Sequence, residues 1–253
     1  MGARYLDEAL LAGVIQVAPT LHTAGPLASP KVLKALARHL CEQPVHHSVE
    51  TGAGVTTLLF SHLSEDHVVF AVDGGSGSSQ NVKTSPLFNA ATTSFVEGPT
   101  QKTLPLYRPE HRLQAALLDG PHAFPFPLLE YYYIYPQLQE KALLILADIH
   151  IRSVHDLYNF LRADEMFELV EVLERTAFFR RTTAPVFDPL GDGWWLQGYN
   201  RTLLLRFTWY EKVRDSIPAS ARAAARSVRR WMLARQGAFR PADRGPGGGR
   251  RTP

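Results

Sequence analysis

The chain has 253 residues, of which 45% are apolar and 20% charged, a composition typical of a soluble globular protein with one large domain or two small ones. Its single cysteine, Cys41, excludes an internal disulfide framework and fits a reducing compartment. No apolar run is long enough to span a bilayer, and no signal-peptide pattern opens the sequence. We therefore expect a cytoplasmic protein with no membrane partner.

Charge is concentrated near the end of the chain. From Ala221 onward there are nine arginines and one acid, Asp243, so this stretch carries +8. Because the whole chain carries +3, the remainder carries −5. We predict a body of residues 1–215 and a tail of residues 216–253, with a basic helix and a disordered end rich in Arg, Gly and Pro. A solubilising tail is the simpler interpretation, and attraction to nucleic acid or anionic lipid is the alternative.

The first elements lead to a glycine-rich turn. A helix is predicted to start at Ser29-Pro30, an N-cap followed by proline, and to end before Pro44. The next stretch is SVETGAGVTTLLFSHLSEDHVVFAVD. It predicts a strand, a turn at 51–54, a helix at 55–63 and a strand at 68–72. This order opens many nucleotide-binding α/β sheets, in which the acid after the second strand accepts hydrogen bonds from a ribose.

Strands and helices continue to alternate after the GGSGSS loop at 74–79, which is either a linker or a loop beside the ligand. Strands are predicted at 92–96, 113–118 and 142–147. Helices are predicted within 124–138 and at 153–161. Two further stretches, 167–179 and 194–199, have strand character and are separated by turn residues. We expect them to form an antiparallel closing pair.

Three apolar runs end in aspartate, namely VVFAVD at Asp73, LQAALLD at Asp119 and ALLILAD at Asp148. Continuous apolar runs suit strands that are covered on both faces, as in a parallel sheet between two helical layers. The sequence therefore predicts a doubly wound, Rossmann-like α/β fold. We expect a seven-stranded, mostly parallel sheet with an antiparallel last strand and helices on both faces. The three aspartates would share the edge where such sheets bind ligands.

The glycine turn restricts the choice of ligand. Thr57 occupies the place of the third glycine of a dinucleotide fingerprint. Glu50 precedes the turn, where its charge would repel a pyrophosphate and favour a ligand with a cationic centre. This stretch resembles the first motif of class I S-adenosylmethionine-dependent methyltransferases, acid-x-Gly-x-Gly, with Glu50, Gly52 and Gly54 in the matching positions.

The resemblance covers roughly residues 23–200 and implies a cofactor site. Glu50, Gly52 and Gly54 would hold the methionine part of S-adenosylmethionine, and Asp73 would hold the ribose. Gly98 follows the third strand and would border the adenine. Asp119 would lie against the cofactor from the fourth strand.

Polar side chains follow the fourth and fifth predicted strands. Asp119 and His122 follow one, and Asp148 and His150 follow the other. Since these strands are adjacent in a doubly wound sheet, we expect the four side chains to converge. They would act as a general base for a hydroxyl, or they would hold a divalent ion that lowers the pKa of that hydroxyl. The alternative is that the acids cap turns and the histidines are structural.

LDGPH resembles the DG-x-H signature of a subgroup of small-molecule O-methyltransferases. The acids that end two strands also resemble those of magnesium-dependent sugar O-methyltransferases. In that group the fifth strand ends in two consecutive acids, whereas here Ala147 precedes Asp148. The resemblance therefore names Asp119 and Asp148 as metal ligands, with Mg²⁺ or Mn²⁺ as the ion, and leaves one expected ligand missing.

The sequence thus favours transfer of a methyl group from S-adenosylmethionine to a hydroxyl of a small molecule, such as a sugar or natural product. An NAD(P)-dependent oxidoreductase is one alternative, disfavoured by Thr57 and Glu50. A nucleic-acid-binding protein or RNA methyltransferase that uses the basic tail is another, although the Asn-Pro-Pro-aromatic motif of base methyltransferases is absent. The tyrosines of YYYIY at 131–135 are expected to pack a helix on the sheet, and the alternative is an acceptor or homodimer surface.

Overall fold

The computed structural model describes residues 7–21, 26–72, 78–200, 213 and 216. Asp73 and nearly all of the basic tail lie outside these residues. The chain divides into two compact units, Met1–Asn200 and Arg201–Pro253. The predicted boundary after residue 215 stays a prediction.

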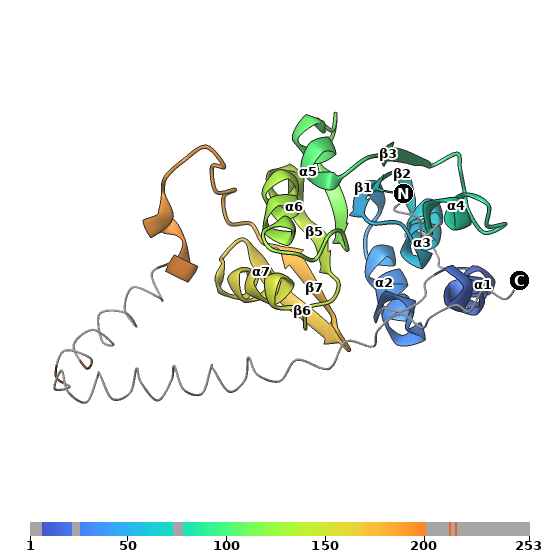
Figure 1. Ribbon diagram of the computed structural model, residues 1–253, viewed down its shortest axis with the longest axis horizontal. Coiled ribbons are helices and arrows are strands. Elements are labelled where there is room, and N and C mark those ends of the chain that lie inside the picture. Colours follow the sequence, from blue (N-terminus) through green and yellow to red (C-terminus); the bar gives the residue numbers. More distant parts are fainter. Residues whose placement is uncertain (1–6, 22–25, 73–77, 201–212, 214–215, 217–253) are drawn as a thin grey trace, which may run out of the picture. The chain divides into compact units, whose positions relative to one another are not determined.

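The first unit is built on a single seven-stranded sheet with the order β3-β2-β1-β4-β5-β7-β6 (Figure 1). Neighbouring strands from β3 to β5 are parallel, and β7 is antiparallel to both β5 and β6. This arrangement confirms the predicted fold class, including the antiparallel last strand. The strands are β1 (Val45–Thr51), β2 (Ser64–Ala71), β3 (Thr93–Glu97), β4 (Leu113–Leu118), β5 (Leu138–Leu146), β6 (Phe167–Leu173) and β7 (Thr176–Arg181).

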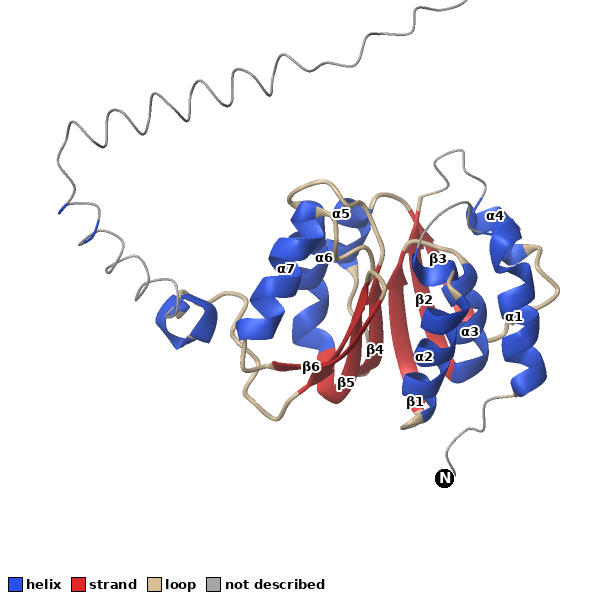
Figure 2. Cartoon of the chain, turned by 90° about the horizontal axis from the view of Figure 1, so that it is seen from below, coloured by secondary structure: helices blue, strands red, loops and turns tan. Residues whose placement is uncertain are grey.

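Helices cover both faces of the sheet (Figure 2). One layer contains α1 (Glu8–Leu21), α2 (Pro30–Cys41), α3 (Val55–Leu63) and α4 (Ser78–Lys83). The other contains α5 (Thr100–Thr103), α6 (Phe126–Ile134) and α7 (Arg152–Ala163). Each layer encloses its own apolar core against the sheet. Among the described residues, no helix has both the length and the apolar character to cross a membrane.

The central strands follow from their sequence. Every residue of β4 is buried, as a continuous apolar run between two helical layers requires. The helix α2 begins one residue after Ser29, with proline in its first turn as predicted. Its apolar residues at helical spacing are buried against the sheet, and they include Val32, Leu33, Leu36 and Leu40.

The predicted closing pair was placed wrongly. Both antiparallel strands lie within residues 167–181, and they are joined by a tight turn at Glu174-Arg175. Residues 194–199 form no strand, and Trp194–Leu196 is a short 3₁₀ helix. Glu174 adopts a left-handed backbone with φ of 54°, a conformation that turns usually assign to Gly or Asn. The sequence therefore lacks the usual turn signal at the point where the hairpin forms.

Candidate functional site

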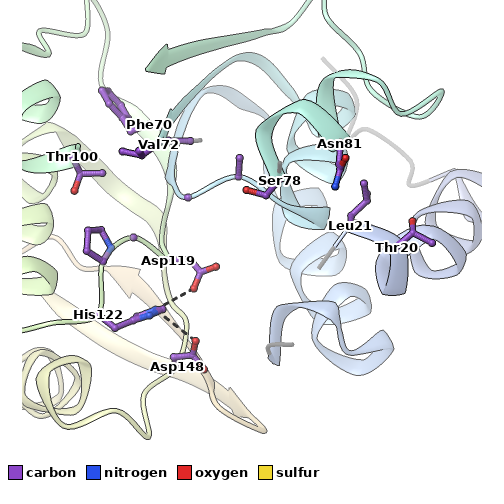
Figure 3. Close-up of a pocket in the computed structure, with 15 residues that line it drawn as sticks. Thr20, Leu21, Phe70, Val72, Ser78, Asn81, Thr100, Asp119, His122 and Asp148 are labelled. Atoms are coloured by element: carbon purple, nitrogen blue, oxygen red, sulfur yellow. Dashed lines mark ion pairs between the residues drawn. The ribbon is translucent and has the colours of Figure 1, made fainter. Parts of the chain in front are cut away.

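A pocket of about 610 Å³ lies beyond the carboxyl ends of the parallel strands (Figure 3). This is where ligands bind in open α/β sheets. Its walls come from the ends of β1, β2, β4 and β5 together with α1, α4 and α5. The lining residues are Thr20, Leu21, Gly52, Ala53, Phe70, Ala71, Val72, Ser78, Asn81, Thr100, Asp119, Gly120, Pro121, His122 and Asp148.

The glycine turn after β1 forms one wall of this pocket through Gly52 and Ala53. The N–H of Gly52 donates to the carbonyl oxygen of Phe70 at 2.9 Å, which continues the pairing of β1 with β2. Gly52 has a φ of 86°, and a Cβ at this position would lie 2.6 Å from the carbonyl oxygen of Asp119. Glycine is therefore required here both for the backbone conformation and for the close approach of β4.

Gly54 and Glu50 do not line the pocket, but they take part in hydrogen bonds that support the glycine turn. Glu50 is fully buried, and its carboxylate accepts hydrogen bonds from the hydroxyls of Thr56, at 3.0 Å, and Thr57. The hydroxyl of Thr57 also accepts the N–H of Gly54 at 3.1 Å. Glu50 therefore fixes the first turn of α3, and its direct contact with a ligand stays a prediction.

Glu50 also belongs to a buried chain of polar groups. His67 Nε2 lies 3.4 Å from Glu50 Oε1, and His67 Nδ1 lies 2.7 Å from the hydroxyl of Ser48. Serine, histidine and an acid in contact are the composition of a hydrolase triad. However, Ser48 and His67 are buried between β1, β2 and the ring of Phe60, which stacks on the imidazole. No substrate reaches them, so this chain of groups is structural.

A further predicted cofactor contact, Gly98, follows β3. Gly98 donates its N–H to the carbonyl oxygen of Ala71 at 3.1 Å and has a φ of 137°, but it does not line the pocket. Thr100, two residues later, does. Asp73 directly follows Val72, another lining residue, and is itself outside the described residues. Ser78, at the start of α4, shows that the end of the GGSGSS segment borders the pocket.

Asp119, His122 and Asp148 converge as predicted. His122 Nε2 lies 3.4 Å from Asp119 Oδ1 and 3.6 Å from Asp148 Oδ2 (Figure 3). The hydroxyl of Ser153, in the first turn of α7, donates to the carbonyl oxygen of His122 and anchors the loop. The interaction with Asp119 is the main cause that raises the pKa of His122 above 6.5, against an opposing effect of burial. The imidazole thus lies between two carboxylates at the wall of the pocket.

His150 lies at the margin of this cluster. Its Nδ1 is 3.5 Å from Asp148 Oδ1, but its side chain is 46% exposed and does not line the pocket. Asp148 has a left-handed backbone with φ of 53°, which Asp tolerates better than most residues. Ala147, where the resemblance placed a further acid, is fully buried.

Asp119, His122 and Asp148 fit a divalent cation, since each offers one ligand atom and these atoms lie within 4.8 Å of one another. Two carboxylates with one imidazole suit Mn²⁺, Fe²⁺ or Zn²⁺ better than Mg²⁺, which prefers an all-oxygen shell. In such a site the imidazole of His122 would supply the ligand that is missing at Ala147.

One residue of this region, Glu130 on α6, was not predicted from the sequence. Its side chain is only 2% exposed, and its Oε2 accepts the hydroxyl of Thr51 at 2.9 Å. Burial is the main cause that raises the pKa of Glu130 to about 7, and the nearby hydroxyls of Thr100 and Thr51 oppose this rise. The available signal was a lone acid in the apolar stretch FPFPLLEYYYIY, because isolated buried acids are costly and often functional.

We expect Glu130→Gln to remove a pH-dependent loss of stability. Since the pKa of Glu130 is raised on folding, its contribution to stability is full below about pH 4.5 and is lost as pH rises through 7. The variant should match the parent at pH 5 and exceed it at pH 8, by at most about 3 kcal/mol of unfolding free energy. Urea unfolding at the two pH values measures this difference. Equal stability of both proteins at pH 8 would contradict the burial of an ionisable acid.

The sequence matches no protein-family model and no curated protein sequence. The fold does match solved structures. A putative O-methyltransferase from Klebsiella pneumoniae aligns with 72% of this chain and 93% of its own, with a TM-score of 0.56 and 10% identity. An O-methyltransferase from Bacillus cereus in complex with S-adenosylhomocysteine (SAH) aligns with 70% and 92%, with a TM-score of 0.54 and 12% identity.

A third similar structure is the O-methyltransferase TomG from Streptomyces achromogenes, involved in tomaymycin synthesis and solved with S-adenosylmethionine. It covers 70% of this chain and 91% of its own, with a TM-score of 0.54 and 14% identity. The chain therefore has the Rossmann-like methyltransferase fold. At identities this low, the likeness extends to the fold alone.

Proposed function

We propose that this protein transfers a methyl group from S-adenosylmethionine to a hydroxyl of a small molecule. The observation that carries the proposal is the pocket itself. It places a glycine turn with a required positive φ at one wall, and an imidazole between two carboxylates at the other. The first suits close approach of a nucleotide-type ligand, and the second suits proton removal from an acceptor. Similar folds solved with S-adenosylmethionine or SAH support this choice of cofactor.

The bound cofactor supplies an electrophilic methyl group on a sulfonium centre, so the protein mainly positions the two reactants. We assign Gly52 and Ala53 to the methionine part of the cofactor, and Asp73 to the ribose. His122 Nε2 takes the proton from the acceptor hydroxyl as the oxygen attacks. Asp119 and Asp148 orient the imidazole and stabilise its protonated form.

A divalent cation is the other way to activate the acceptor at this site. Asp119, His122 and Asp148 would hold it, and it would lower the pKa of a coordinated hydroxyl. In that case His122 would be a ligand and could not also be the base, so the two arrangements exclude each other.

The cofactor assignment is tested by calorimetry with SAH and NADH as probes. We expect SAH to bind at micromolar strength and NADH not to bind. Asp73→Ala should weaken SAH by roughly 1–3 kcal/mol, the loss of a hydrogen bond to a charged group, or about five- to 150-fold in Kd. A protein that binds NADH and not SAH would be an oxidoreductase, and the proposal would fail.

A further inference from the structure

Glu130 is an acid that the proposed chemistry does not use. It lies on α6, beneath the ends of β1 and β4, and it contributes nothing to the pocket wall itself. Its Oε1 is buried and makes no hydrogen bond among the described residues. An apolar side chain of similar size would avoid the cost of burying this group. The carboxyl therefore needs a reason other than stability.

The contacts of Glu130 lead to the acceptor side of the pocket. The hydroxyl of Thr51 donates to Glu130 Oε2 at 2.9 Å and accepts the N–H of Asp119 at 3.1 Å. A hydroxyl can do both at once, since it has one proton and two lone pairs. The side chain of Thr51 thus joins the carboxyl of Glu130 on α6 to the backbone at the end of β4.

Glu130 also explains the glycine that follows Asp119. A Cβ built on Gly120 would overlap both carboxylate oxygens of Glu130. Gly120 is not among the described glycines with positive φ, so its backbone does not by itself demand glycine. Glycine is needed for lack of space, because the carboxyl of Glu130 packs directly against the main chain of Gly120. Gly120 and Glu130 therefore form a matched pair, with the acid filling the volume that the glycine leaves.

We propose that Glu130 is a positioning residue that clamps the Asp119–His122 turn against the end of β1. The clamp acts from one side of β4, through Thr51 and Gly120. From the other side, Gly52 allows the carbonyl of Asp119 to approach the glycine turn. The clamp sets the distance between the two walls of the pocket, and with it the alignment of acceptor and cofactor. This inference rests on the proposed function, because it takes the pocket to be the cofactor site.

The experiment measures SAH binding by calorimetry and the melting temperature for four single variants. Glu130→Met replaces the carboxyl with an apolar side chain of similar length, and Glu130→Gln keeps an oxygen for Thr51. Thr51→Val removes the hydroxyl alone. Tyr131→Phe is the control, since it removes a neighbouring buried hydroxyl that has no partner among the described residues.

We expect Glu130→Met to melt no more than a few degrees below the parent and to bind SAH about ten-fold more weakly, equivalent to about 1.4 kcal/mol, the worth of one net hydrogen bond. Thr51→Val should show a similar loss. The Thr51→Val, Glu130→Met double variant should lose no more than either single variant, since both remove the same link. Glu130→Gln and Tyr131→Phe should bind SAH as the parent does.

A second pair of variants tests the packing without any ligand. Gly120→Ala should lower the melting temperature of the parent, and the same substitution should cost nothing more in a Glu130→Ala background, where the methyl group has space. The clamp is overturned if Glu130→Met binds SAH as tightly as the parent, or if Tyr131→Phe loses as much affinity as Glu130→Met. It is also overturned if Gly120→Ala costs the same in both backgrounds. Failure of the parent itself to bind SAH would instead refute the proposed cofactor.

Discussion

His122→Ala should lower the turnover number by about 10²–10⁴-fold, the usual contribution of a positioned general base. The imidazole is the only nitrogen base that lines the described part of the pocket, and it faces two carboxylates at 3.4 and 3.6 Å. Turnover is measured as SAH release, once a screen of hydroxyl compounds has supplied an acceptor. His155→Ala is the matched control, because this histidine, on α7, bonds the carbonyl oxygen of Ile149 at 3.0 Å and does not line the pocket.

The pH dependence distinguishes a base from a metal ligand. A base must be neutral, and Asp119 raises the pKa of His122, so activity should fall as pH drops through a value above 6.5. Asp119→Asn removes the main cause of this shift and should move the acid limb of the profile to lower pH. Under this mechanism a chelator changes nothing. If a chelator abolishes turnover while SAH still binds, His122 is a ligand and the base mechanism is wrong.

The sheet was predictable because its central strands are continuous apolar runs. Such runs mark strands buried on both faces, and β4 was predicted with its observed bounds, Leu113–Leu118. The hairpin of β6 and β7 was not found, because its turn uses Glu174 at positive φ where a turn motif would have Gly or Asn. The aromatic residues of 194–199 then suggested a strand from β-propensity alone, which depends strongly on packing context.

The convergence of Asp119 and Asp148 was predictable for a topological reason. Parallel neighbours end at the same edge, so acids after β4 and β5 had to converge, and Asp119 and Asp148 do. Glu130 was not predictable in this way. It reaches the site from the middle of a helix, and only tertiary packing brings α6 beneath Gly120. The role of Glu50 was also hidden, since the partners of its carboxylate are threonines on the following helix.

Gly52→Ala should destabilise the protein by roughly 2–4 kcal/mol and reduce SAH binding below detection. A non-glycine residue at φ of 86° costs about 1–3 kcal/mol by itself. The added methyl group would also lie 2.6 Å from the carbonyl oxygen of Asp119, so either β4 or the turn must move. Both movements change the pocket wall, because Gly52 and Asp119 each line it.

Thermal unfolding and calorimetry check this prediction, and Gly54→Ala is the matched control. Gly54 has a φ of −171°, extended backbone that any residue adopts, so the same added methyl group meets no conformational penalty there. At about 2–4 °C per kcal/mol for a domain of this size, we expect the Gly52→Ala melting temperature to fall by roughly 4–16 °C. The control lacks the positive-φ penalty and should therefore melt several degrees above Gly52→Ala. If both variants have the melting temperature of the parent, the turn does not hold the left-handed backbone on which the proposed cofactor site depends.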